Sequence, residues 1–345
     1  MSTKPLVLVT GATGLLGFRV LVLTLQAGYR ARIAHRRADQ PDKIKATKSL
    51  QPYLKDIEFI RITDITASDA FDEGVKGADY VLHVASPVFD TTDGGGEVRD
   101  WQTEFYDPSV KGTVSVLSAA LKAPGIKRVV LTGSVVALEP RQGSEVAGPF
   151  DVRALPPTEV LASFTDPRPA YVMSKTMSHI AVDDWARDHP QAHFDIVRVL
   201  PGYIQGANEL ALDVETILKS SSEGSLNAAL GVLQDQEKPV VQVHIEDVSR
   251  AHVVALDQKK INGGQVLIAV SNNGTGWSWD AFVEAAEKVF PEEVKAGRLS
   301  PKKGQAVRPT AFNVSETYKA LGYEFAGPEE MVRSVVGQYL EVTAK

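Results

Sequence analysis

The feature that most constrains this fold is a glycine-rich turn between an apolar strand and a helix, Thr10-Gly-Ala-Thr-Gly-Leu-Leu-Gly17. Its three glycines allow a tight turn, a close approach of the backbone to a pyrophosphate and close packing of the helix on the strand. The helix amino terminus then offers free N–H groups and a partial positive charge to phosphates. This context predicts a dinucleotide site; the alternative is a tight turn without a ligand. The expected contacts are Thr10, Gly11, Thr13, Gly14, Leu15, Leu16 and Gly17.

The first two thirds of the chain alternate short apolar strands with helices. This alternation is typical of a parallel α/β sheet whose strands are covered on both faces. The expected strands are Leu6–Thr10, Ala31–His35, Glu58–Ile62, Tyr80–Val84, Arg128–Thr132 and Phe194–Leu200. The expected helices are Leu15–Ala27, Pro41–Leu54, Asp69–Lys76, Val98–Leu121 and Ala170–Asp188. Six strands in this rhythm predict a doubly wound Rossmann sheet.

After Gly206 this rhythm changes. We expect a polar, interrupted helical region at 209–233, strands at 240–244 and 265–271, and helices at 247–257, 279–289, 315–321 and 328–342. We therefore predict a Rossmann domain over residues 1–205, to which about 240–272 return. Residues 206–239 and 273–345 would form a smaller, mainly helical substrate-binding domain over the carboxyl end of the sheet.

Composition excludes several classes of function. The chain has no Cys, so disulfides, thiolate chemistry and Cys-ligated metal sites are excluded, and its seven His residues lack paired ligand spacing, so no metal is expected. With 37 basic and 43 acidic residues the net charge is −6, which disfavours nucleic-acid binding. No apolar stretch approaches a membrane span, and strand-like sequence from Pro5 leaves no room for a signal peptide. We expect a soluble cytoplasmic protein, a monomer or homodimer, with a small-molecule ligand.

The second expected strand ends in His35-Arg36-Arg37, with Lys43 following. An NAD site usually carries an acidic residue here to bind the ribose hydroxyls. A guanidinium can instead bind the 2′-phosphate of NADP(H) through two hydrogen bonds and stack on the adenine. Arg36, Arg37 and Lys43 therefore predict NADP(H). Two alternatives stay open: both arginines are solvated surface residues, or nearby Asp39 serves an NAD site.

The sequence Tyr171-Val-Met-Ser-Lys175 opens the helix between the fifth and sixth expected strands. At this spacing the phenol and the ammonium lie on one helix face, and the ammonium should draw the phenol pKa down. Ser134 ends the fifth strand, where its hydroxyl would face the cleft. We therefore predict Ser134, Tyr171 and Lys175 as catalytic residues; a turn or cap residue is the alternative for Ser134.

Together these motifs resemble the extended short-chain dehydrogenase/reductases. The chain is most similar to the branch of dihydroflavonol reductase, cinnamoyl-CoA reductase and fungal or yeast ketoreductases. The resemblance covers roughly residues 5–272, and the carboxyl-terminal remainder is only weakly patterned. Further matching segments are Gly28–Arg32, Asp64-Ile65, His83–Pro87, Val110–Thr113, Pro201–Ile204 and Val243–Val248.

The resemblance implies hydride transfer between NADP(H) and a medium-sized ketone or aldehyde. Ser134 would hydrogen-bond the carbonyl oxygen, Tyr171 would act as general acid, and Lys175 would hold the ribose. Asp64 and Ile65 would flank the adenine. Further expected cofactor contacts are Val84, Ala85 and Ser86 at the ribose and Pro201 and Ile204 at the nicotinamide. The substrate pocket would include Val88, Phe89, Val135 and Tyr203.

Three positions depart from the family pattern. Lys111 stands where Asn is common, and we expect it to point outward, so that protons reach Tyr171 through the ribose hydroxyl and Lys175. Gly133 replaces a serine, which should loosen the strand end. The segment 135–138 lacks the polar residue of flavonoid reductases, which argues for an apolar pocket wall.

Two other functions use the same architecture. The first is a sugar-nucleotide epimerase or dehydratase, or a hydroxysteroid-type dehydrogenase/isomerase; epimerases of this kind usually retain NAD, so Arg36 counts against them. The second is a non-enzymatic NADP-sensing regulator, which tends to lose the Tyr/Lys pair that is intact here. We interpret His83, His244 and Asp247 as structural.

Overall fold

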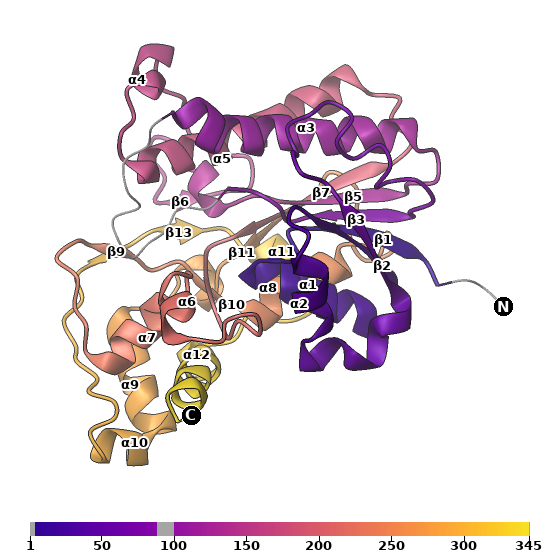
Figure 1. Ribbon diagram of the computed structural model, residues 1–345. Helices are drawn as coiled ribbons and strands as arrows, with labels where there is room; N and C mark the ends of the chain where they lie inside the picture. The colour runs from indigo at the N-terminus through magenta and orange to yellow at the C-terminus, as the bar shows by residue number, and fades with distance from the viewer. Residues whose placement is uncertain (1–3, 88–99, 345) are drawn as a thin grey trace.

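Seven parallel strands form the sheet around which the chain is built (Figure 1). The computed structural model describes residues 4–87 and 100–344. The strand order is β11-β7-β5-β4-β1-β2-β3, so the direction of winding reverses between β1 and β4, where ligands bind in such sheets. The strands are β1 (Leu6–Thr10), β2 (Arg30–His35), β3 (Ile57–Arg61), β4 (Tyr80–His83), β5 (Arg128–Thr132), β7 (Asp195–Pro201) and β11 (Val266–Ala269). The six strands expected for the sheet are confirmed, and the expected strand at 265–271 supplies the seventh.

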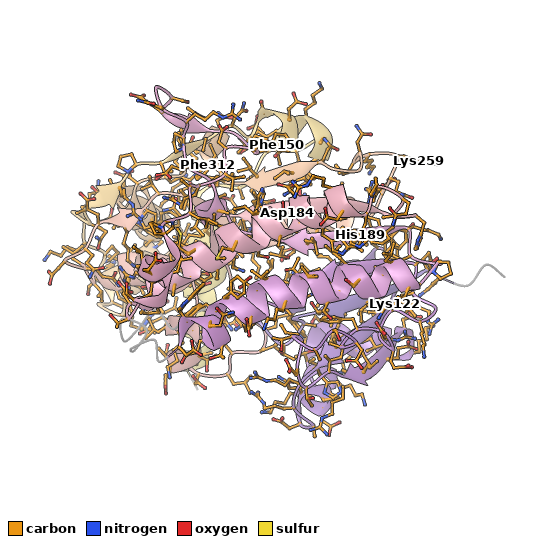
Figure 2. The ribbon with its side chains drawn as sticks, turned by 90° about the horizontal axis from the view of Figure 1, so that it is seen from above. Lys122, Phe150, Asp184, His189, Lys259 and Phe312 are labelled. Carbon is orange, nitrogen blue, oxygen red and sulfur yellow. The ribbon has the colours of Figure 1, made fainter. Side chains whose placement is uncertain are left out.

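Side chains of β1 alternate between two apolar layers, as a strand covered on both faces requires. Val7 and Val9 join the cluster under α1 (Leu15–Gln26) and α8 (Ile245–Val254). Leu6 and Leu8 join the cluster under α3 (Asp107–Lys122) and α5 (Pro167–Asp188). Figure 2 shows α3 and α5 side by side over one face of the sheet, with Lys122 and Asp184 on them.

Three expected helices differ from the structure. Residues 41–54 form α2 (Gln40–Lys45) and a 3-10 helix, η1 (Lys48–Asp56), because Pro52 cannot supply an N–H in a continuous α-helix. Residues 69–76 form turns, with Gly74 against the side chain of Leu8 and Gly77 at φ +71°. The helix expected at 98–121 begins instead with a π-helical turn, η2 (Gln102–Tyr106), before α3; residues 98 and 99 lie outside the described part.

The later part of the chain adds a third apolar cluster, built from α7 (Glu223–Leu230), α9 (Trp279–Val289) and α12 (Pro328–Thr343). The polar region expected at 209–233 is two helices, α6 (Val214–Leu218) and α7, with the serine-rich segment between them. Pairs of short parallel strands connect this region to the rest (Figure 1). They are β8 (Tyr203–Gln205) with β10 (Gln242–His244), β9 (Lys238–Pro239) with β12 (Val307–Arg308), and β6 (Val146–Ala147) with β13 (Ala311–Phe312).

Smaller helices complete the described chain. They are η3 (Val135–Ala137), α4 (Thr158–Ala162), η4 (Asn272–Gly274), α10 (Pro291–Lys295) and α11 (Ser315–Leu321). Within residues 4–87 and 100–344, no helix combines the length and the apolar character that crossing a membrane requires.

Candidate active site

The glycine-rich turn lies at the carboxyl end of β1, packed against the chain that follows β4. Gly11 has φ +74°, and a β-carbon there would lie 2.6 Å from the nitrogen of Ala85. A β-carbon on Gly17 would lie 2.1 Å from the carbonyl oxygen of Gly11. Gly14 begins α1 without a side-chain cap, which leaves N–H groups of the first helical turn for a ligand. The turn therefore fits a pyrophosphate.

Thr10 connects this turn to the end of β4. Its Oγ1 accepts hydrogen bonds from the backbone N–H groups of Val84 and Ala85, at 3.1 and 3.0 Å. The same oxygen lies 3.0 Å from Nδ1 of buried His83, whose pKa desolvation lowers to about 4. His83 is therefore neutral near pH 7, which agrees with a structural role. These contacts fix the backbone on which Ser86 sits.

At the end of β2, only one of the three expected cations lines the cleft. Arg36 does, whereas Arg37 and Lys43 are exposed and pair with Asp39, at 3.5 and 2.7 Å. The sequence did not indicate Gln40, whose Oε1 accepts the backbone N–H groups of both Arg36 and Arg37 at 2.9 Å. The side chain of Gln40 therefore fixes the loop that carries Arg36.

The three predicted catalytic residues come together at the carboxyl ends of β5 and β7. Ser134 follows β5, and its Oγ accepts the N–H of Val136 at 3.4 Å. Tyr171 and Lys175 project from the first turns of α5, which begins at Pro167 after the side chain of Asp166 accepts the N–H of Arg168. Ser134 lies near enough to the Tyr171 phenol to act on its pKa through hydrogen bonding.

Lys175 extends the contacts toward the glycine-rich turn. Its Nζ donates to Oγ of Ser86 at 2.6 Å and lies 5.4 Å from the centre of the Tyr171 ring. Desolvation lowers the pKa of Lys175 to about 8. Lys175 is therefore hydrogen-bonded to Ser86, and both line the same cleft as Ser134 and Tyr171.

The expected lowering of the Tyr171 pKa by Lys175 is not found. Burial raises the pKa of the Tyr171 phenol, and its hydrogen bond with Ser134 opposes that change only in part. The Lys175 ammonium is directed at Ser86. Tyr171 is therefore a protonated phenol near neutral pH, as a proton donor must be.

One cleft of about 2270 Å³ joins the glycine-rich turn to Ser134 and Tyr171. That is well above the roughly 300–1,000 Å³ of ordinary ligand pockets, so a dinucleotide and a second molecule can share it. All the predicted cofactor contacts except Arg37 and Lys43 line this cleft, as do the pocket candidates Val135 and Tyr203. Val88 and Phe89 lie outside the described residues.

Two of the departures from the family pattern now have a structural account. Lys111 points outward as expected: its side chain is 52% exposed and its Nζ lies 2.8 Å from Asp107. The expectation that Gly133 loosens the strand end is wrong. A β-carbon there would lie 2.3 Å from Cδ2 of Leu200, and the Gly133 N–H donates to Val199 O at 2.9 Å. The absence of a side chain lets β7 pack closely against this position.

His244 and Asp247 lie at the junction of the sheet with the carboxyl-terminal segment. The Asp247 carboxylate accepts the N–H of Ala326 at 2.7 Å, and the Asp247 carbonyl accepts the Tyr323 hydroxyl at 2.9 Å. Neither His244 nor Asp247 lines the cleft. Their contacts therefore agree with a structural role.

Sequence reasoning also missed a charged pair in the cleft. Glu223 and Lys238 are both buried, line the cleft and pair with each other. They lie 15 residues apart in sequence, on α7 and β9. Because their pairing depends on how these two elements are placed, no local pattern predicts it. Only the presence of charged residues in a segment expected to cover the sheet could have pointed to them.

Comparison with known proteins covers nearly the whole chain. The sequence model of the NAD dependent epimerase/dehydratase family matches residues 7–269. Ketoreductase CTB6 of Cercospora beticola is 32% identical, over 99% of this chain and 96% of its own length. Ketoreductase sphI of Aspergillus fumigatus is 31% identical over 98% of both chains. Yeast methylglyoxal/isovaleraldehyde reductase Gre2, solved in complex with NADPH, is 22% identical, with a TM-score of 0.81 over 98% of this chain and 99% of that one.

Proposed function

The chain belongs to the NAD dependent epimerase/dehydratase family, an extended short-chain dehydrogenase/reductase family, and on that premise we propose that it is an NADPH-dependent reductase of ketones or aldehydes. The observation that carries the proposal is that Ser134, Tyr171 and Lys175, one helical turn after Tyr171, line the cleft that contains the glycine-rich turn. The two ketoreductase relatives support the same reaction class.

In this proposal the carbonyl oxygen of the substrate is held by Ser134 and Tyr171. NADPH, when bound, supplies the hydride that adds to the carbonyl carbon. Tyr171 donates its proton to the oxygen as negative charge develops there, and Ser134 stabilises that charge with a hydrogen bond. Carbonyl, hydride and proton together give the alcohol. Lys175 holds the ribose side of the site and returns a proton to Tyr171.

The choice of NADPH over NADH rests on Arg36. It lines the cleft at the end of β2, where an NAD site usually carries an acidic residue. The neighbouring acid, Asp39, is exposed and paired with Lys43. A guanidinium in this position suits the 2′-phosphate, which only NADPH carries.

The experiment mixes purified protein with NADPH and a panel of ketones and aldehydes, and follows both cofactor oxidation and alcohol formation. We expect one alcohol for each NADPH consumed. An epimerase, a dehydratase or a cofactor-sensing regulator would consume no NADPH with this panel. That result would overturn the proposal.

Tyr171→Phe tests the proton donor within the same assay. Losing a positioned general acid typically lowers turnover roughly 10²–10⁴-fold, while NADPH affinity, measured by fluorescence titration, should stay close to normal. Tyr106→Phe is the matched control, because Tyr106 packs in the same apolar cluster as Tyr171 but does not line the cleft. More than a tenth of wild-type turnover in Tyr171→Phe would show that another group supplies the proton.

A further inference from the structure

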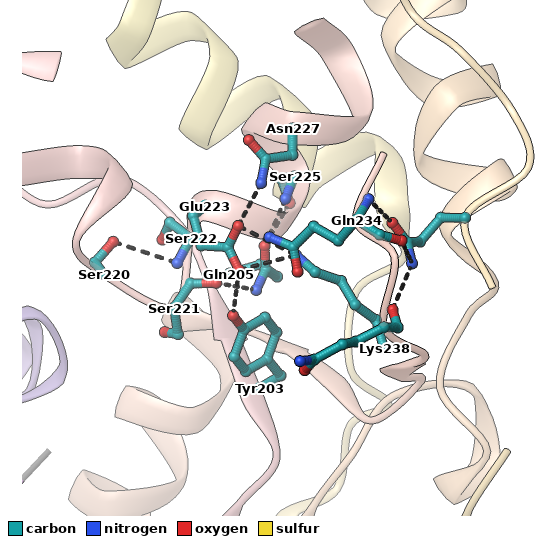
Figure 3. A network of polar contacts seen from close by, with 12 residues as sticks. Tyr203, Gln205, Ser220, Ser221, Ser222, Glu223, Ser225, Asn227, Gln234 and Lys238 are labelled. Carbon is teal, nitrogen blue, oxygen red and sulfur yellow. Dashed lines mark hydrogen bonds and ion pairs between the residues drawn. The ribbon is translucent and has the colours of Figure 1, made fainter. Parts of the chain in front are cut away.

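A buried charged cluster lies in the part of the cleft formed by α7 and β9 (Figure 3). Glu223 is 5% exposed and Lys238 8% exposed. The Nζ of Lys238 lies 2.9 and 3.1 Å from the two carboxylate oxygens of Glu223. A buried ion pair is a poor device for stability alone, because desolvating two charges offsets most of their attraction. Because this ion pair lies in the wall of a ligand cleft, we expect it to have a role other than stability.

The hydroxyl of Tyr203 donates its proton to this cluster. Tyr203 Oη lies 2.7 Å from Glu223 Oε1, and Asn227 Nδ2 donates to the other carboxylate oxygen (Figure 3). An ionised carboxylate has no proton to give, so the tyrosine is the donor. Burial, together with the charge of Glu223, holds the pKa of Tyr203 well above its ordinary value, so the phenol stays protonated. Because its proton is used in the bond to Glu223, the Tyr203 oxygen can only accept a hydrogen bond from any other partner.

The phenol is held in this orientation by its surroundings. Gln205, two residues further along β8, accepts the N–H and the hydroxyl of Ser225 at 3.0 and 2.7 Å, which fixes α7 to the strand. Gly224 lets α7 approach Trp279, since a β-carbon there would lie 2.3 Å from the indole ring. That indole meets the Tyr203 ring edge-on, with 6.2 Å between ring centres.

The cluster belongs to the substrate side of the cleft. Tyr203 packs against the apolar cluster that contains Val135, the residue directly after Ser134. Arg168, three residues before Tyr171 on α5, donates a hydrogen bond to Gln236, two residues before Lys238. Tyr203 therefore lines the same cleft as Ser134 and Tyr171.

We propose that Tyr203 is a specificity-determining residue whose oxygen accepts a hydrogen bond from a hydroxyl group of the substrate. The preferred substrates are then ketones or aldehydes that carry a hydroxyl group at a distance from the reacting carbonyl. A methyl ether or a carboxylate at that position has no proton to donate to the Tyr203 oxygen. This inference rests on the proposed carbonyl reductase function.

The test compares pairs of substrates in wild-type protein and in Tyr203→Phe. The probes are methyl ketones with a terminal hydroxyl at increasing distance from the carbonyl, each paired with its O-methyl ether. For the best-fitting chain length we expect wild-type kcat/KM to favour the hydroxyl compound about five- to tenfold, as one neutral hydrogen bond allows. In Tyr203→Phe that ratio should fall toward one, mainly through KM.

Tyr318→Phe is the matched control. Tyr318 packs against the same apolar cluster and donates its hydroxyl to Val270 O at 3.3 Å, but it does not line the cleft. Its substitution should leave the selectivity ratio at the wild-type value. A general loss of packing would instead change both variants alike.

A second variant keeps the hydroxyl of Tyr203 and changes only its partner. Glu223→Gln combined with Lys238→Met leaves no unpaired buried charge, and it allows an amide N–H to donate to Tyr203 Oη. The phenol proton then becomes available, so the preference for the hydroxyl compound over its ether should decrease at least twofold. The melting temperature of each variant checks that it folds.

Two results would overturn the inference and are distinguishable from each other. Wild-type ratios near one at every chain length, or an unchanged ratio in Tyr203→Phe, would exclude the hydroxyl subsite while leaving the reductase function intact. Failure of the wild type to reduce any ketone or aldehyde would remove the proposed function, and this inference with it.

Discussion

Desolvation sets the protonation of three side chains around the proposed reaction. It lowers the pKa of Lys175 to about 8 and that of His83 to about 4, and it raises that of Tyr171. Near neutral pH the site therefore holds a protonated phenol, a neutral imidazole and an ammonium close to its own titration. Because the pKa of Lys175 lies close to neutral pH, its ammonium can return a proton to Tyr171 after each turnover.

The lowered pKa of Lys175 predicts how stability changes with pH. Its unfolded pKa is near 10.5, so between about pH 8 and pH 10.5 the unfolded state binds more protons and stability rises with pH. Below about pH 8 the ammonium is buried in its charged form, so the free-energy cost of its desolvation is fully present. Raising the pH from about 7 to about 10 should therefore stabilise the wild type by roughly 2–3 kcal/mol relative to Lys175→Met.

Urea unfolding of both proteins at the two pH values measures this difference, because other titrating groups cancel between them. Lys175→Met should also lose turnover. A stability difference independent of pH would mean that Lys175 has an ordinary pKa in the folded protein.

Arg36→Ala should weaken NADPH far more than NADH. A charge-assisted hydrogen bond contributes roughly 1.5–3 kcal/mol, so the NADPH/NADH affinity ratio should fall about 10–150-fold. Arg37→Ala is the control, because Arg37 is exposed, pairs with Asp39 and does not line the cleft. Binding is measured by fluorescence titration of both cofactors, and equal losses for the two would assign Arg36 a structural role.

The candidate site was predictable where local sequence determines position. Ser134 ends a parallel strand, and Tyr171 and Lys175 lie on one face of the helix that follows. In a sheet of this kind both places are at the carboxyl edge, where ligands bind. Two further contacts were not predictable. Gln40 accepts the N–H groups of its own loop only in the conformation that this loop adopts. Glu223 meets Lys238 only because α7 and β9 pack together.

The helix α3 explains why the substitution of Asn by Lys111 is tolerated. The inward side of the helix is apolar, with Leu117 fully buried and Val110 nearly so. Lys111 lies on the other side, where Asp107 one turn earlier raises its pKa through their hydrogen bond. Its charge is therefore compensated at the surface and does not reach Lys175.

Lys111→Asn should change turnover by less than about fivefold, because the Lys111–Asp107 ion pair is exposed and screened by solvent. The pH optimum should move by less than about one unit, since Lys111 contacts none of Ser134, Tyr171 and Lys175. The pH profile of kcat measures both quantities. A tenfold loss of turnover would place Lys111 in the proton relay after all.

Strands were easier to predict than helices, for a physical reason. A strand covered on both faces is a short apolar run, and β1, β4 and β5 have that pattern without ambiguity. Helical periodicity is weaker evidence where few residues are buried. Between 69 and 77 the acidic and glycine residues favour successive turns over a helix.

A buried arginine connects widely separated parts of the molecule. Arg128, at the start of β5, is fully buried and makes two hydrogen bonds to the Asp195 carboxylate at the start of β7. It also donates to the carbonyls of Ala255 and Ile261, at 2.6 and 2.7 Å. One side chain thus joins two central strands to the segment that leads into β11.

Arg128→Met should destabilise the protein by about 3–5 kcal/mol, because it leaves two buried carbonyl acceptors without a donor and removes the ion-pair partner of Asp195. Urea unfolding followed by circular dichroism measures this loss. Arg187→Met, at an exposed arginine that pairs with Asp184 on the surface, should leave the free energy of unfolding close to the wild-type value. Similar losses in the two variants would show that the Arg128 contacts add little stability.

The position of β11 has a consequence for synthesis on the ribosome. β11 (Val266–Ala269) pairs with β7 (Asp195–Pro201) at one side of the sheet, yet it is translated long after its partner. At roughly 5–20 residues per second, β7 waits several seconds for β11. Throughout that interval it presents an unpaired apolar edge, to which another nascent chain can add as a strand. Shielding β7 until residue 269 has emerged is therefore the step at which a chaperone would most improve the yield of folded protein.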